Sequence, residues 1–125
     1  MIKEDYVSFE TAKLLKEKGF DSECDYLYVN GNIVRAQGYR CNWNKGETIF
    51  TNYKNECSAP TLQMAMKWLR EVHDVIINIF YDGEEEAWCA EYYRMLIGDY
   101  VLIGHYKTYE QACETAIKWC LDSLV

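Results

Sequence analysis

Two seven-residue stretches with the same pattern of apolar and charged residues constrain this chain most strongly. AMKWLRE occupies residues 65–71 and AIKWCLD occupies residues 116–122. Both place apolar residues three and four positions apart, which is typical of an amphipathic helix. Each follows a segment rich in aromatic and β-branched residues, which are enriched in strands. Helices and strands are therefore expected to follow one another in the same order in both halves of the chain.

The first and last helices are predicted from the signals at their ends. Ser8 can cap a helix over about 9–18, and Gly19 can end it in the left-handed conformation. Thr108 and Gln111 form a capping box at the start of the last helix. Both helices are therefore expected to begin at these caps.

The middle helix is predicted from its apolar stripe. It is expected to begin near Pro60, because proline suits a first helical turn, and to end near Val72 or His73. The predicted buried positions are Leu62, Ala65, Met66, Leu69 and Val72.

Strands are expected between the helices. In the first half, residues 25–29 and 33–37 flank the Asn30-Gly31-Asn32 turn, whose residues tolerate the positive φ of a tight hairpin. A weaker third strand is expected over 48–53.

In the second half, residues 75–81 are apolar on both faces, which favours a central strand. Residues 86–96 and 100–106 are predicted to pair through a two-residue turn at Gly98-Asp99. Each half therefore has three predicted strands.

These elements define an α+β fold with antiparallel sheets and three helices in the order α-βββ-α-βββ-α. A single domain over residues 1–125 is expected, because the length is near the commonest domain size and half of the residues are apolar. A degenerate duplication of a βββα unit would explain the repeated pattern. Convergence of two short amphipathic helices would explain it as well, and both explanations stay open.

Charge and composition narrow the choice of partners. Twenty acidic and 13 basic residues give a net charge of −7, and no cluster of Lys and Arg offsets it locally. Binding to nucleic acid is therefore disfavoured, whereas a basic partner would be steered toward the protein. No apolar stretch is long enough for a signal peptide or a membrane span, so a cytoplasmic protein with reduced cysteines is expected.

No catalytic residue, cofactor or metal site is predicted. The spacings of Cys and His do not match zinc motifs, and the acidic turn at residues 82–86 lacks the alternating ligands of a calcium loop. Cys89 and His105 would need to be neighbours to act as a nucleophile and a base. With residue 97 opposite residue 100, His105 would instead face Tyr92, so catalysis by this pair is not expected.

A candidate interaction surface comes from the helices. Met64, Trp68 and Trp119 lie at or beyond the edge of the predicted buried stripes. A strip of Met and Trp would suit a protein partner. The alternative is packing, because tryptophan is highly buried on average.

Three stretches carry a resemblance: YVSFETAKLLKEKGFD (6–21), SAPTLQMAMKWLRE (58–71) and TYEQACETAIKWCLDSLV (108–125). They resemble a group of small uncharacterised proteins of gut Bacteroides-type bacteria and their prophages or phages. The resemblance covers the helices and implies an intracellular accessory protein of mobile-element origin. It implies no activity, ligand or catalytic residue.

The leading hypothesis is a non-enzymatic cytoplasmic module that binds a protein partner through its helix edge or through the acidic, aromatic surface of its sheet. A sharper version is an acidic decoy that occupies the site of a DNA-binding protein. One alternative is a small-ligand binder or enzyme with a tyrosine-lined pocket between sheet and helices. The other is a structural protein that forms a homodimer through Trp68 or a strand edge.

Overall fold

The computed structural model describes residues 1–36, 40–45 and 56–125. It has the α+β fold and the element order predicted from the sequence, with three helices and two three-stranded antiparallel sheets. The chain divides into two compact units, Met1–Thr61 and Leu62–Val125, which we call unit 1 and unit 2. The single domain expected over 1–125 stays a prediction.

Unit 1 begins with the predicted first helix, α1 (Phe9–Glu17). The Ser8 hydroxyl accepts a hydrogen bond from the amide of Thr11 at 3.2 Å, which confirms the N-cap. At the other end, Gly19 has φ of +94°, and the amide of Phe20 donates to the carbonyl of Leu15. This is the C-terminal arrangement that a glycine after a helix favours.

The predicted hairpin forms between β1 (Tyr26–Val29) and β2 (Asn32–Arg35). Asn30 and Gly31 both have positive φ, as a two-residue turn of this hand requires. The third strand of this sheet is β3 (Cys57–Ser58), and β1 lies in the centre. The strand expected over 48–53 lies outside the described residues.

A buried tryptophan organises the rest of unit 1. Trp43, in the short 3-10 helix η1 (Trp43–Lys45), is 1% exposed. Its indole Nε1 donates to the carbonyl of Cys24 at 2.8 Å, and its amide donates to the Ser58 hydroxyl at 3.1 Å. Asn44 adds hydrogen bonds to Phe20 and Ser58, so one short segment links the end of α1 to β3.

Unit 2 begins with α2 (Leu62–His73). The prediction that Pro60 occupies its first turn is wrong, because the carbonyl of Pro60 instead accepts the amide of Val7 and the helix begins two residues later. The predicted stripe is correct except at its end, where Val72 is 58% exposed.

The sheet of unit 2 consists of β4 (Ile76–Asp82), β5 (Ala87–Tyr93) and β6 (Tyr100–Tyr106), in that order. The central strand is therefore β5, and the prediction that residues 75–81 form a central strand is wrong. These residues are apolar on both faces because one face of β4 packs in the core and the other is an apolar surface that no element of the described chain covers.

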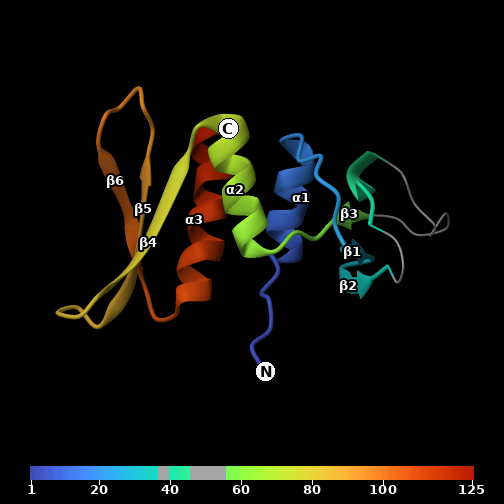
Figure 1. Cartoon of the computed structure of the whole chain (residues 1–125), viewed down its shortest axis with the longest axis horizontal. Helices are drawn as coiled ribbons and strands as arrows, with labels where there is room; N and C mark the ends of the chain where they lie inside the picture. Colours follow the sequence, from blue (N-terminus) through green and yellow to red (C-terminus); the bar gives the residue numbers. More distant parts are fainter. Residues whose placement is uncertain (37–39, 46–55) are drawn as a thin grey trace. The chain divides into compact units, whose positions relative to one another are not determined.

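One face of this sheet is covered by α3 (Tyr109–Leu124), and α2 packs on α3 and β4 (Figure 1). Ala90, Ala112 and Ala116 are fully buried where α3 meets the sheet. These small side chains let the helix approach the strands closely, and larger apolar residues surround them. The N-cap of α3 is confirmed, since Thr108 Oγ1 accepts the amide of Gln111 at 3.0 Å, whereas the Gln111 side chain accepts the amide of Lys107 at 3.3 Å and so departs from the predicted capping box.

β5 and β6 pair with each other as predicted, but the predicted turn and register are wrong. A six-residue connection, 94–99, replaces the two-residue turn, and a bulge follows Ala90. Tyr93 therefore lies opposite Tyr100, and Cys89 lies opposite His105.

The two sheets also differ in strand order. The first strand is central in the described part of unit 1, whereas the second is central in unit 2. A duplicated unit that kept its topology would not show this difference.

Candidate interaction surface

The three residues predicted to form a surface strip differ in exposure. Trp68 is only 6% exposed, and its ring packs against that of His73 at 4.7 Å between centroids. Met64 is half-buried. Trp119 is 37% exposed and packs on Tyr92 of the sheet. Trp68 is therefore a packing residue, and the three do not form one exposed strip.

A different apolar surface is exposed on the sheet of unit 2. Side chains alternate between the faces of a strand, so every second residue points away from α3. The register places these residues in three rows across the strands, which we call the open face: Phe80, Cys89 and His105; Asn78, Glu91 and Leu102; Ile76, Tyr93 and Tyr100. A hydrogen bond of 2.9 Å joins Asn78 to Glu91, and the rings of Tyr93 and Tyr100 lie 5.3 Å apart. Contacts between neighbouring strands therefore hold some of the side chains of the open face in place.

The open face leaves large apolar side chains in contact with solvent. Ile76 and Phe80 are each 38% exposed, Tyr100 is 50% exposed and Leu102 is 53% exposed. Ten of the thirteen exposed large apolar residues of the described chain lie in unit 2. The exposed large apolar side chains of the described residues are therefore concentrated in unit 2.

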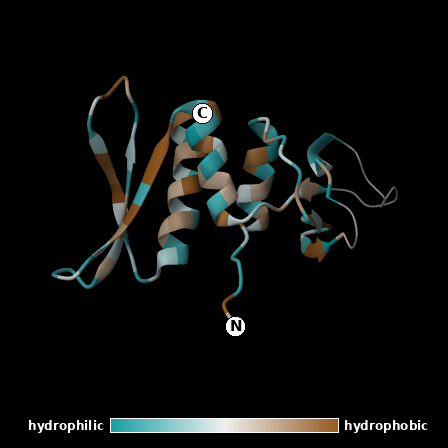
Figure 2. Ribbon diagram, in the orientation of Figure 1, coloured by the Kyte–Doolittle hydropathy of each residue, from teal (hydrophilic) through white to brown (hydrophobic). Residues whose placement is uncertain are grey.

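An apolar loop continues the open face at one end. Between β5 and β6, Met95, Leu96 and Ile97 are 83%, 95% and 51% exposed. Main-chain hydrogen bonds from Ile97 and Gly98 to the carbonyl of Arg94 hold this loop in a turn. Figure 2 shows brown, hydrophobic residues at the tip of this loop and along β4 and β6. We call Met95–Ile97 the apolar tip.

The other end of the sheet is acidic. The β4–β5 turn contains Asp82, Glu84, Glu85 and Glu86, and the Asp82 carboxylate accepts the amides of Glu84 and Glu85 at 3.0 and 3.3 Å. This ordered segment, residues 82–86, is the acidic turn. The three strands contain neither Lys nor Arg. The open face therefore has carboxylates at one end and in its middle row, without a compensating side-chain cation on the strands.

Cys89 lies in this negative field. It is 1% exposed, and desolvation raises the pKa of its thiol, as do the nearby carboxylates of Asp82, Glu85 and Glu91. His105, its cross-strand neighbour, is exposed. The predicted register, which separates Cys89 from His105, is wrong. A thiol with a raised pKa is nevertheless a poor source of the thiolate that nucleophilic catalysis needs.

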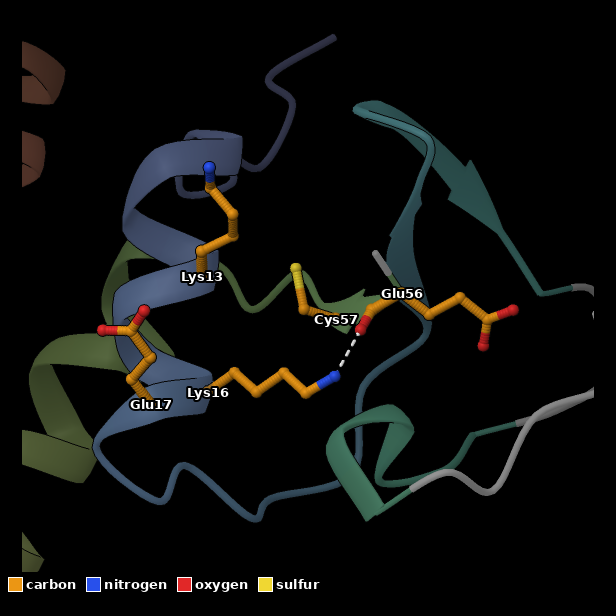
Figure 3. Close-up of a pocket in the computed structure, with 5 residues that line it drawn as sticks. All are labelled: Lys13, Lys16, Glu17, Glu56 and Cys57. Atoms are coloured by element: carbon orange, nitrogen blue, oxygen red, sulfur yellow. Dashed lines mark hydrogen bonds between the residues drawn. The ribbon is translucent and has the colours of Figure 1, made fainter. Parts of the chain in front are cut away.

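Unit 1 contains a small pocket between α1 and β3 (Figure 3). Its volume is about 190 Å³, and Lys13, Lys16, Glu17, Glu56 and Cys57 line it. Lys16 Nζ donates to the carbonyl of Glu56 at 2.8 Å, whereas the Glu56 side chain points away from the lysines. Burial raises the pKa of the Cys57 thiol to about 11, although Lys16 and Lys13 lower it. At neutral pH this thiol is protonated and unreactive.

Within residues 1–36, 40–45 and 56–125, no cluster of three His, Cys, Asp or Glu side chains could hold a metal ion. No helix in the same residues has the length and hydrophobicity needed to cross a membrane.

The sequence suggests an acidic, aromatic surface on the sheet, but it identifies no residue of the open face and does not indicate the apolar tip. The signal is present in residues 75–81, whose apolar side chains on both faces favour a central strand. In an edge strand, the same pattern means that one apolar face is uncovered.

Comparisons with protein-family models, with curated proteins and with solved structures find no match to this chain.

Proposed function

We propose that this protein is a non-enzymatic interaction module that binds a protein partner through the open face and apolar tip of unit 2. The observation that carries the proposal is the exposure of large apolar side chains on the two edge strands, β4 and β6, on the face that α3 does not cover, continued by the apolar tip. Contiguous apolar surface of this kind is uncommon on monomeric proteins and marks binding sites.

The energetics support a binding role. Each Å² of apolar surface removed from water contributes about 25 cal/mol, so covering Phe80, Leu102 and the apolar tip would yield a substantial driving force. The Asn78–Glu91 hydrogen bond and the Tyr93–Tyr100 contact hold part of the face in place before binding. A preorganised surface loses less entropy when a partner binds.

The alternative of a ligand-binding protein or enzyme has less support. The pocket of unit 1 is smaller than the roughly 300 Å³ at the lower end for ligand sites, and no tyrosine lines it. The raised pKa values of Cys57 and Cys89 favour protonated thiols at both positions.

The place of action that we propose is the cytoplasm, where six free cysteines would stay reduced. An accessory role in a mobile element, as the resemblance of the helices implies, is part of this proposal.

Site-specific photo-crosslinking in the native cells tests the proposal. A photoreactive amino acid replaces Tyr100 or Leu102 on the open face, and Lys67 or Glu71 on the exposed side of α2 in the matched controls. We expect a protein adduct of defined mass from positions 100 and 102, lost when Phe80→Ser is added, and absent from positions 67 and 71. Equal adducts from all four positions, or none from the open face, would contradict the proposal.

A further inference from the structure

The distribution of charge in unit 2 indicates which partner the open face would accept. Unit 2 has eleven acidic and five basic residues, a net charge of −6 of the −7 of the whole chain. The acidic turn and Glu91 place part of this charge beside the exposed apolar side chains.

The open face also has a direction. Each strand has seven residues at about 3.3 Å per residue, so the face extends roughly 20 Å from the apolar tip to the acidic turn. Apolar side chains lie at one end and along the rows, and carboxylates lie at the other end. A complementary segment must have the same polarity, with apolar residues followed by cations.

We infer that the partner of the open face is a protein segment with an apolar side and a lysine- or arginine-rich end, bound with that end at the acidic turn. This inference rests on the proposed function and adds the chemistry and orientation of the partner. The strands supply no basic side chain to the acidic turn, and Lys107, directly after β6, is one cation beside its four carboxylates, so cations of a partner would meet unneutralised negative charge. Desolvation is the main cause of the raised pKa of Cys89, and the carboxylates of Asp82, Glu85 and Glu91 raise this pKa further, which places part of the negative charge beside the open face.

Other occupants fit less well. A second copy of the chain would bring its own open face, which has no Lys or Arg, so the acidic turn would stay unpaired and two Glu91 side chains would meet in the middle rows. Nucleic acid and anionic lipid are repelled by the same carboxylates.

Two synthetic peptides test the inference on the full-length protein. Both have the same apolar residues, and one ends in three lysines whereas the other ends in three glutamates. Binding is measured by fluorescence anisotropy, and the surface is mapped by amide shifts in NMR spectra. We expect the lysine peptide to bind and to shift residues of β4, β5 and β6, and the glutamate peptide to bind at least tenfold more weakly.

Two triple variants with the same change of net charge separate local from overall electrostatics. E84Q/E85Q/E86Q neutralises the acidic turn, whereas E71Q/E110Q/D122N neutralises three exposed carboxylates on the helices. We expect the first to weaken binding of the lysine peptide about tenfold and the second less than twofold. Equal weakening would overturn the inference, because general attraction would then explain binding.

The remaining outcomes are distinct. Equal binding of both peptides, or binding of neither, would overturn the inference that the partner segment has a basic end. Crosslinking at positions 100 and 102 would still decide the proposed function. Unchanged binding in Leu102→Ser would overturn the role of the apolar rows. A dimer in sedimentation equilibrium that L102S dissociates would assign the face to a second copy and overturn the inference.

Discussion

At the scale of single residues, burial separates the four tryptophans. Trp43 is enclosed and hydrogen-bonded through its ring, Trp68 is buried, Trp88 is half-buried and Trp119 is 37% exposed. The sequence does not rank the exposure of Trp68 and Trp119, because spacing on a helix shows which side a residue is on and not how far its neighbours extend. Val72 shows the same limit, since it continues the stripe of α2 in sequence but lies beyond the covered part.

Trp43→Phe should destabilise the protein by about 2–4 kcal/mol, because it removes the buried hydrogen bond from the indole to the carbonyl of Cys24 and opens a small cavity. Urea denaturation measures the loss. The same substitution at Trp119 is the control and should cost less than about 1 kcal/mol. Similar losses at the two positions would show that the indole hydrogen bond contributes little.

Buried thiols predict how stability depends on pH. Desolvation raises the pKa of Cys120 to about 12, although Arg94 lowers it, and the ordinary value is 9.0. The neutral thiol is therefore favoured in the folded state, so its contribution is fully present below pH 9 and is lost as pH rises toward 12. Between pH 9 and 11, wild type should lose up to about 1.4 kcal/mol per pH unit more than Cys120→Ala. Parallel curves for the two proteins would contradict this.

At the scale of elements, the sequence predicts helix caps and the hairpin turn more accurately than it predicts strand register. Ser8, Gly31 and Thr108 act within a few residues of themselves, and the structure confirms their capping and turn roles. The register of β5 and β6 depends on the six-residue connection and the bulge, where no local pattern sets the pairing. The residues of the open face could not be predicted, because the exposure of a strand depends on what covers it, and that is a property of the assembled sheet.

The bulge in β6 is a site where side-chain space is limiting. A Cβ on Gly104 would lie 2.7 Å from the Tyr106 hydroxyl and 3.0 Å from its ring carbon Cζ, whereas Gly83 has nothing within 4 Å. Gly104→Ala should force Tyr106 to shift from its packing against α3, at a cost of about 1–3 kcal/mol. Gly83→Ala is the control and should change the thermal midpoint little. Equal midpoints for both variants would show that Tyr106 moves freely.

At the scale of the whole molecule, charge and exposed apolar surface are both concentrated in unit 2. Unit 1 is nearly neutral, with nine acidic and eight basic residues. Overall composition predicted an acidic protein, but it could not show that one unit carries most of the charge. That distribution required the division of the chain into units.

The single domain predicted from length and composition should unfold in one cooperative step. Differential scanning calorimetry checks this through equal calorimetric and van't Hoff enthalpies. Trp43 reports on unit 1, and Trp68, Trp88 and Trp119 report on unit 2. Thermal unfolding followed by tryptophan fluorescence is the second measurement. Separate transitions for Trp43 and for the tryptophans of unit 2 would show that the units are independent domains.

The strands without Lys and Arg have a consequence for regulation. Acetylation, methylation and other acylations modify the amino group of lysine, and β4, β5 and β6 offer no such group. Lys107, directly after β6, is the nearest lysine in the chain, and its acetylation would make this end of the sheet more negative. Each acetylated lysine of the partner would instead lose its attraction to the acidic turn, so the same mark would act in opposite directions on the two proteins.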